Sequence, residues 1–117
     1  MIHHIVLFKI TEFDDELDRQ KKIEELKSIF EKQSGKIQTI KSYEVGANIN
    51  TSNCAYDVAI NSTFKTVDDL KAYIIHPDHQ YAIEKASSIP KTKVIVDYEV
   101  HRTRKSSPDS GKIEKVS

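Results

Sequence analysis

The sequence is short of glycine and cysteine, and each shortage argues against a class of function. Its 117 residues include three glycines, at positions 35, 46 and 111, so the chain has no glycine-rich loop that could cradle nucleotide phosphates. Kinase, NTPase and dinucleotide chemistry are therefore disfavoured. Cys54 is the single cysteine, which excludes an internal disulfide and leaves a cysteine-based zinc site without its usual partners.

Long apolar runs and an excess of charge of one sign are also absent. The longest apolar runs, such as Ile5 to Phe8, are far shorter than the roughly 20 residues that a membrane span needs, and no apolar signal segment opens the chain. Eighteen basic and eighteen acidic side chains cancel, so no global field favours nucleic acid or an anionic membrane. We expect a cytoplasmic protein with no nucleic-acid or membrane partner, no cofactor and no bound metal.

The composition indicates one globular domain followed by a polar tail. With 38% apolar and 31% charged residues, the chain suffices for one core but not for two. We place the domain at residues 1–101. Residues 102–117 carry Ser, Pro, Gly and a modest excess of basic side chains, which is typical of a solvated extension; an arm laid over a partner subunit fits the same composition.

The hydrophobic pattern alternates between strand and helix signals. In the first helix, Leu17, Leu26 and Phe30 lie on the face expected to be buried. The predicted order is strand 3–9, helix 11–35, strand 37–45, strand 56–64, helix 66–74, helix 77–88 and strand 93–100. This order predicts an α+β, ferredoxin-like βαββαβ protomer whose four-stranded antiparallel sheet carries its helices on one face.

The second sheet face has no helix to cover it in this arrangement. In the last strand, Val94, Val96, Tyr98 and Val100 alternate onto one side of the pleat. A large apolar face is costly to leave in water, and a twofold pairing of two copies is the commonest way to cover it. We therefore expect a homodimer whose sheets meet face to face.

Polar chemistry concentrates in one segment, between Tyr73 and His79. Pro77 lacks an amide hydrogen and disfavours helical geometry at His76 before it, so one short helix ends there and another begins. His79 would titrate near neutral pH, which makes it a candidate general acid or base. His76 is expected to cap the new helix or to face solvent.

Several short motifs occur in a characteristic order along the chain. They are His4-Ile5-Val6-Leu7-Phe8-Lys9, Val45-Gly46, Tyr56-Asp57, Phe64, the segment from Tyr73 to His79, and Asp97-Tyr98. Together they resemble the stress-responsive dimeric α/β-barrel family, often shortened to Dabb. The resemblance covers residues 1 to 100 and implies a ferredoxin-like protomer in a homodimer whose two sheets form a barrel.

The resemblance also implies functional positions. One plant branch of the family, which includes olivetolic acid cyclase, cyclises a polyketide in a pocket between sheet and helices. A tyrosine and the second histidine of its His-Pro-x-His segment carry acid/base work, and these match Tyr73 and His79. A first-strand histidine and a fourth-strand aspartate match His4 and Asp97.

This chain departs from that branch beyond the second histidine. Small glycines of the branch are replaced by the bulky Tyr81 and Ile83, which, with Ile89, are expected to fill or narrow a long tunnel.

Alternation supplies the walls of the expected pocket. His4, Val6 and Phe8 share one side of the first strand, while Val58 and Ile60 share one side of the third. We expect these five residues to line a pocket for a small apolar ligand. Asp57 falls on the opposite side of the third strand in the same pattern.

The sharpest functional hypothesis is a catalytic trio. His79 would exchange a proton, Tyr73 would hydrogen-bond a carbonyl and stabilise an enolate, and Asp97 would hold the tautomer of His79. Such a site would work without a cofactor on a carbonyl-bearing ligand, in the manner of a cyclase or lyase.

The alternative is a non-catalytic stress-response or structural dimer, in which His79 caps a helix and Tyr73 fills the core. A zinc site built from the histidines is disfavoured because Pro77 distorts their spacing.

Overall fold

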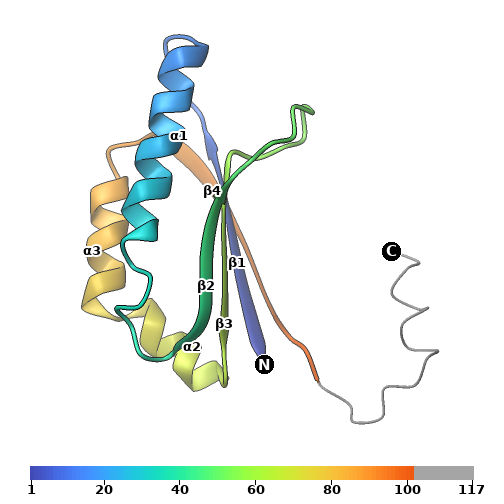
Figure 1. Ribbon diagram of the computed structural model, residues 1–117, viewed down its shortest axis with the longest axis vertical. Coiled ribbons are helices and arrows are strands. Elements are labelled where there is room, and N and C mark those ends of the chain that lie inside the picture. Colours follow the sequence, from blue (N-terminus) through green and yellow to red (C-terminus); the bar gives the residue numbers. More distant parts are fainter. Residues whose placement is uncertain (102–117) are drawn as a thin grey trace, which may run out of the picture.

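A computed structural model describes residues 1–101, and its helices and strands follow the predicted order (Figure 1). Helix α1 begins at Glu16 rather than at residue 11, because the side chain of Asp15 caps it. The predicted tail, residues 102–117, lies outside the described residues. The elements are β1 (Ile2–Ile10), α1 (Glu16–Glu31), β2 (Ile40–Ala47), β3 (Val58–Phe64), α2 (Val67–Ile74), α3 (Pro77–Ala86) and β4 (Lys91–Glu99).

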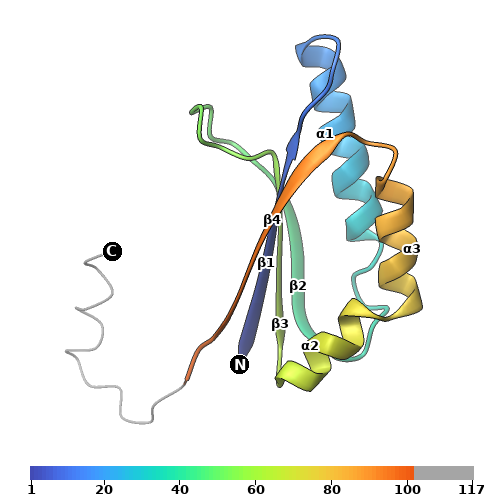
Figure 2. The ribbon, with the colours of Figure 1, turned by 180° about the vertical axis from the view of Figure 1, so that it is seen from behind.

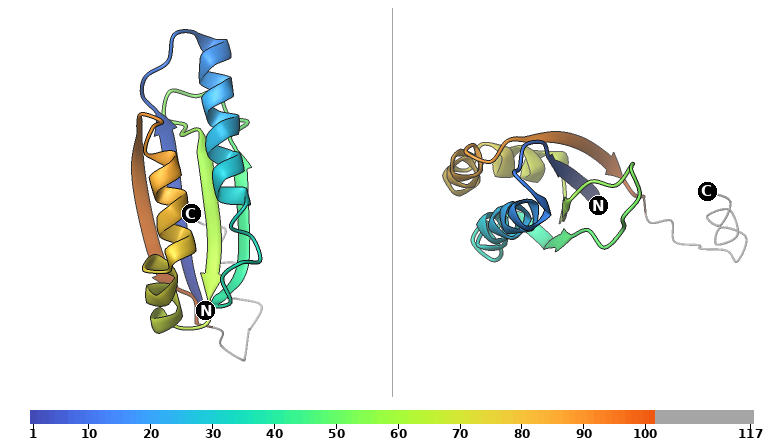
Figure 3. Two further views of the ribbon diagram at one scale, coloured as in Figure 1. Left: turned by 90° about the vertical axis from the view of Figure 1, so that its left-hand side faces the viewer. Right: turned by 90° about the horizontal axis from the view of Figure 1, so that it is seen from above.

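The four strands form one antiparallel sheet in the order β2-β3-β1-β4, and the helices lie together on one of its faces (Figure 2; Figure 3). Strand β1 is central, and its burial alternates strictly, with even-numbered side chains buried and odd-numbered side chains half-buried. The predicted ferredoxin-like βαββαβ fold is confirmed. Within residues 1–101, no helix has the length and apolar character to cross a membrane.

The core lies between the sheet and the inner face of α1. Leu26 and Phe30 of this helix are buried, and Phe30 stacks on Phe8 of β1 with ring centroids 5.4 Å apart. Leu17, which the apolar pattern assigned to the same face, is 66% exposed, so that assignment was wrong: it lies nine residues from Leu26, about two and a half helical turns, and therefore on the opposite side of the helix. The first turn of α1 also extends beyond the end of the sheet (Figure 1).

Capping residues fix the ends of the helices. The Thr66 hydroxyl accepts a hydrogen bond from the backbone N–H of Asp69 in the first turn of α2. At the junction, Nδ1 of His76 accepts the backbone N–H of Asp78 at 3.0 Å, and Pro77 takes the first position of α3. The predicted capping role of His76 is therefore confirmed. Gly35, with φ of +79°, allows the turn that follows α1.

The face of the sheet opposite the helices carries an uncovered apolar stripe. Val94, Val96 and Tyr98 of β4 are exposed there, on the shared side that alternation predicts. The register sets Val94 beside Leu7 and Val96 beside Ile5 of β1. These five side chains define what we call the apolar stripe.

Leu26 and Leu17 allow a matched test of this packing within one helix. Leu26 has no exposed surface, so Leu26→Ala should lower the free energy of unfolding by about 2–5 kcal/mol through lost burial and a residual cavity. Leu17→Ala should change it by less than about 0.5 kcal/mol. Urea unfolding monitored by circular dichroism measures both, and equal losses would contradict the described orientation of α1.

Candidate functional site

Four aromatic rings from four different elements meet on the helix side of the sheet. His4 comes from β1, Phe64 from β3, Tyr73 from α2 and His79 from α3. The ring centroids of Tyr73 and His79 lie 4.2 Å apart, and those of His4 and Tyr73 lie 5.8 Å apart. The structure thus brings together three residues that the sequence singled out, and we call these four rings the aromatic cluster.

Asp97 joins this cluster through His4. The two residues face each other directly in the antiparallel register of β1 and β4, so their side chains lie on the same sheet face. Nδ1 of His4 is hydrogen-bonded to Oδ1 of Asp97. The expected pairing of Asp97 with His79 was therefore wrong, because cross-strand register, which the sequence does not show, assigns the carboxylate to the other histidine.

His79 is buried without a hydrogen-bonding partner at one nitrogen. Its side chain sits in the first turn of α3 and the residue is 8% exposed, while its Nδ1 accepts no hydrogen bond and donates none. Burial, together with smaller electrostatic contributions from His4, Lys93 and His76, lowers the pKa of His79 to about 4. The imidazole is therefore neutral at neutral pH. The alternative role as a helix cap belongs to His76 instead.

Tyr73 is a neutral phenol in this environment. Its ring is buried between those of Phe64 and His79, and this burial raises the pKa of the hydroxyl above its ordinary value. Such a group donates a hydrogen bond at neutral pH and does not ionise.

Most of the expected pocket walls are core residues. Val6, Val58 and Ile60 are buried and pack under α1, and the alternation correctly assigned them to the helix side. Phe8 differs from them, because it also borders an open cavity of about 270 Å³ between α3 and the edge of the sheet. We call this cavity the β4 cleft; its lining is Phe8, Phe30, Ile83, Ala86, Ser87, Lys91 and Lys93.

The three side chains expected to fill a tunnel lie in three different places. Ile89 is buried in the core, Ile83 borders the β4 cleft, and Tyr81 is exposed on the outer surface of α3. Tyr81 therefore does not occupy space between helices and sheet.

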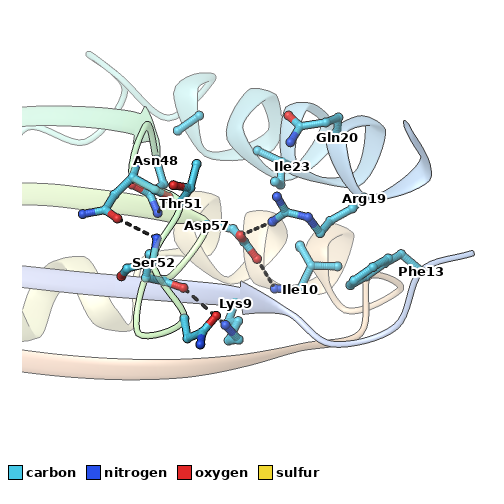
Figure 4. A pocket seen from close by; sticks show the side chains of 14 residues that line it. Lys9, Ile10, Phe13, Arg19, Gln20, Ile23, Asn48, Thr51, Ser52 and Asp57 are labelled. Atoms are coloured by element: carbon cyan, nitrogen blue, oxygen red, sulfur yellow. Dashed lines mark hydrogen bonds and ion pairs between the residues drawn. The ribbon is translucent and has the colours of Figure 1, made fainter. Parts of the chain in front are cut away.

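A second, polar cavity of about 290 Å³ lies where β1 ends near the first turns of α1 and the loop between β2 and β3 (Figure 4). Sequence reasoning missed it. Asp57 accepts the backbone N–H of Ile10 at 2.7 Å and pairs with the guanidinium of Arg19, which also contacts Glu16. Alternation had assigned Asp57 to the opposite sheet face, but β3 begins only at Val58, so the alternation does not extend to it. The ion pair of Arg19 and Asp57 ties α1 to the sheet, and Nζ of Lys9 donates a hydrogen bond to the carbonyl of Ala55 at 3.2 Å.

The histidines do not gather around a common point. Nδ1 of His76 caps helix α3, while the rings of His4 and His79 both contact the ring of Tyr73. Among residues 1–101, no group of three or more His, Cys, Asp or Glu side chains is arranged to hold a metal ion.

The fold and the aromatic cluster define a ferredoxin-like α+β protein with a histidine–tyrosine site on the helix side of its sheet. A family model described as the stress responsive A/B barrel domain, Dabb, matches residues 2–100. The chain belongs to this family.

Known relatives agree with this assignment. An uncharacterized protein from Streptomyces coelicolor is 36% identical over 100 residues, which is 85% of this chain and 99% of the relative. A dimeric protein of unknown function with a ferredoxin-like fold from Bacteroides fragilis is 31% identical, with a TM-score of 0.73 over 85% of this chain and 95% of that one. A hydroxynitrile lyase from Passiflora edulis shares the fold at 17% identity, with a TM-score of 0.68 over 87% of this chain and 94% of the lyase.

The lowered pKa of His79 predicts a pH dependence of stability. Below about pH 6.5, His79 binds a proton in the unfolded chain but stays unprotonated in the folded chain. The free energy of unfolding is therefore highest above that pH and decreases as the pH falls toward about 4. His79→Gln should make this fall shallower by up to about 1.4 kcal/mol per pH unit, measured by urea unfolding at a series of pH values. His101→Gln is the control, because the side chain of His101 is 78% exposed. An unchanged pH dependence in His79→Gln would contradict the buried, neutral imidazole.

Proposed function

We propose that the protein is a homodimer that binds a small, apolar, carbonyl-bearing molecule at the β4 cleft and performs acid/base chemistry on it. The observation that carries this proposal is the pair of histidines beside one tyrosine. His4 is oriented by Asp97, whereas His79 is buried with Nδ1 unpartnered. Buried polar groups normally have partners, so an unpartnered nitrogen beside an oriented imidazole favours a ligand.

The dimer is supported by the apolar stripe. Three exposed large side chains of β4 and two half-buried side chains of β1 lie side by side on the face that no helix covers. Pairing of two such faces removes this surface from water. The Bacteroides fragilis relative, at 31% identity, is described as dimeric.

Access to the site is supported by the open edge of the sheet. Among the described residues, no Cα atom of α3 lies within 8 Å of a Cα atom of β4. The helix-facing side of β4 therefore stays exposed from Lys93, which borders the β4 cleft, through Ile95 to Asp97. These four residue steps span roughly 13 Å. A small apolar molecule entering the cleft would lie along Ile95 and reach the aromatic cluster.

We assign the base to His4. Asp97 accepts a hydrogen bond from the Nδ1–H of His4, which leaves the lone pair of Nε2 free to take a proton. His4 would remove a proton from the carbon next to the ligand's carbonyl, and the electron pair of that C–H bond would move to the carbonyl oxygen. Return of the proton to carbon completes the cycle without any redox partner.

The other two residues stabilise the charge that develops. The neutral phenol of Tyr73 donates a hydrogen bond to the enolate oxygen. His79, with a pKa of about 4, is too weak a base to compete with His4 at neutral pH, so we assign it to holding the ligand through Nδ1. These roles differ from the hypothesis drawn from the sequence, in which His79 was the base.

The second candidate function is a non-catalytic stress-response dimer of the cytoplasm. It is favoured by the close packing of Tyr73 on His79, at 4.2 Å between centroids, and by the core positions of Val6, Val58 and Ile60. In that case the selected property is the stability of the dimer, and the aromatic cluster serves packing alone.

The apolar stripe predicts that one charge dissociates the dimer. Val96→Asp places a carboxylate on the uncovered face and should yield monomers at micromolar concentration in analytical ultracentrifugation. Ile95→Asp is the matched control, since it puts the same charge on the opposite side of the same exposed strand and should leave the dimer intact. A monomeric wild-type protein, or equal dissociation of both variants, would contradict a dimer through this face.

The proposed chemistry predicts proton exchange next to a carbonyl. Acetylacetone and acetophenone serve as probes, and wild-type protein in D2O should accelerate deuterium incorporation at their α-carbons, followed by NMR. Asp97→Asn and His4→Gln should reduce the rate by about 10²-fold or more, and Tyr73→Phe by a similar factor.

Tyr81→Phe is the control for this experiment, because Tyr81 is exposed on the outer surface of α3 and should retain the wild-type rate. Absence of exchange with both probes in a dimeric, folded wild-type protein would reject the enzymatic proposal in favour of the non-catalytic dimer.

A further inference from the structure

A third cavity lies outside the aromatic cluster and the β4 cleft. It opens between the C-terminal end of α1 and the first turns of α3, which lie side by side (Figure 3), and its volume is about 120 Å³. This volume is several times the roughly 30 Å³ that a water molecule occupies in the liquid. It shares no lining residue with the β4 cleft; its own lining is Ile29, Lys32, Gln33, Lys36, Asp78, Tyr81, Ala82 and Lys85.

The lining is strongly cationic for a chain with no net charge. Lys32, Lys36 and Lys85 face Asp78 as the one acidic residue of the cavity. Within residues 1–101, no carboxylate oxygen lies within 4 Å of these three ammonium groups, whereas Lys22 and Lys27 on the same helix form ion pairs. Lys85 is held over the ring of Tyr81, with its Nζ 5.7 Å from the ring centroid.

A buried amide at the same cavity lacks a partner. Gln33 is 3% exposed, and its Oε1 makes no hydrogen bond. The neighbouring lysines do not supply one, although each carries three donors. Surface lysines alone define no site, but an unpartnered side chain that lines the same cavity and is more than nine-tenths buried requires a hydrogen-bonding group that the described chain does not provide.

We propose that this cavity binds the phosphate group of a small molecule. A phosphate offers several oxygens that accept hydrogen bonds from Lys32, Lys36 and Lys85, and in its singly protonated form it also has an O–H that donates to Oε1 of Gln33. A carboxylate or a sulfate is fully ionised near neutral pH and lacks that donor. This site is independent of the proposed acid/base chemistry.

NMR titration of the full chain with inorganic phosphate, at constant ionic strength and near-neutral pH, tests the proposal. We expect saturable shifts, at millimolar phosphate, of the Gln33 side-chain amide and of residues 81–85, with weaker binding of sulfate. Lys36→Gln combined with Lys85→Gln should weaken phosphate binding at least about tenfold. Lys21→Gln is the matched control, because Lys21 is an exposed lysine at the other end of α1, and it should leave binding unchanged.

Gln33→Met keeps the length of the side chain and removes the amide, so it should abolish the preference for phosphate over sulfate. If that variant does not fold, the double lysine variant still decides the question. Methyl phosphate as a second titrant shows whether the natural ligand is free phosphate or an ester: binding of either ligand supports the site. Shifts that do not saturate, equal binding of sulfate and phosphate, or equal effects of Lys21→Gln and the double variant would overturn it.

Discussion

Strand β1 is the constraint on which the rest of the structure depends. It pairs with β3 on one side and β4 on the other, so its alternation sets the two faces of the whole sheet. Its even-numbered side chains lie under the helices, and this one series supplies both Phe8 of the core and His4 of the aromatic cluster. Its odd-numbered side chains supply Ile5 and Leu7 of the apolar stripe. A slip of one residue would exchange these two sets, so core, site and stripe are specified together.

The helices cover the two ends of the strand order unequally. Helix α1 packs over Val58 and Ile60, whereas no helix closely covers β4 at the sheet edge. His4 lies at the boundary between these regions: its side chain is 3% exposed, while that of its partner Asp97 is 44% exposed. The pair therefore combines a buried imidazole with a carboxylate that water still solvates.

Much of the fold was predictable, and the errors have specific causes. The cap at His76 was correct because a cap involves groups only a few residues apart. Leu17 was misassigned because nine residues are about two and a half turns of helix, so its side chain lies on the side of α1 opposite Leu26. The unpartnered amide of Gln33 carries no sequence signal, since its surroundings come from two helices that the chain separates widely.

The sequence by itself determined the order of elements, the junction at Pro77, the family and the alternation that divides each strand between two faces. These features depend on residue type and on spacing within one element. Only the tertiary structure decided that Asp97 orients His4 and leaves His79 unpartnered, because a hydrogen bond between residues 93 positions apart is set by the register of two strands. The same holds for the β4 cleft and the lysine cavity, whose walls exist only once helices and sheet have packed.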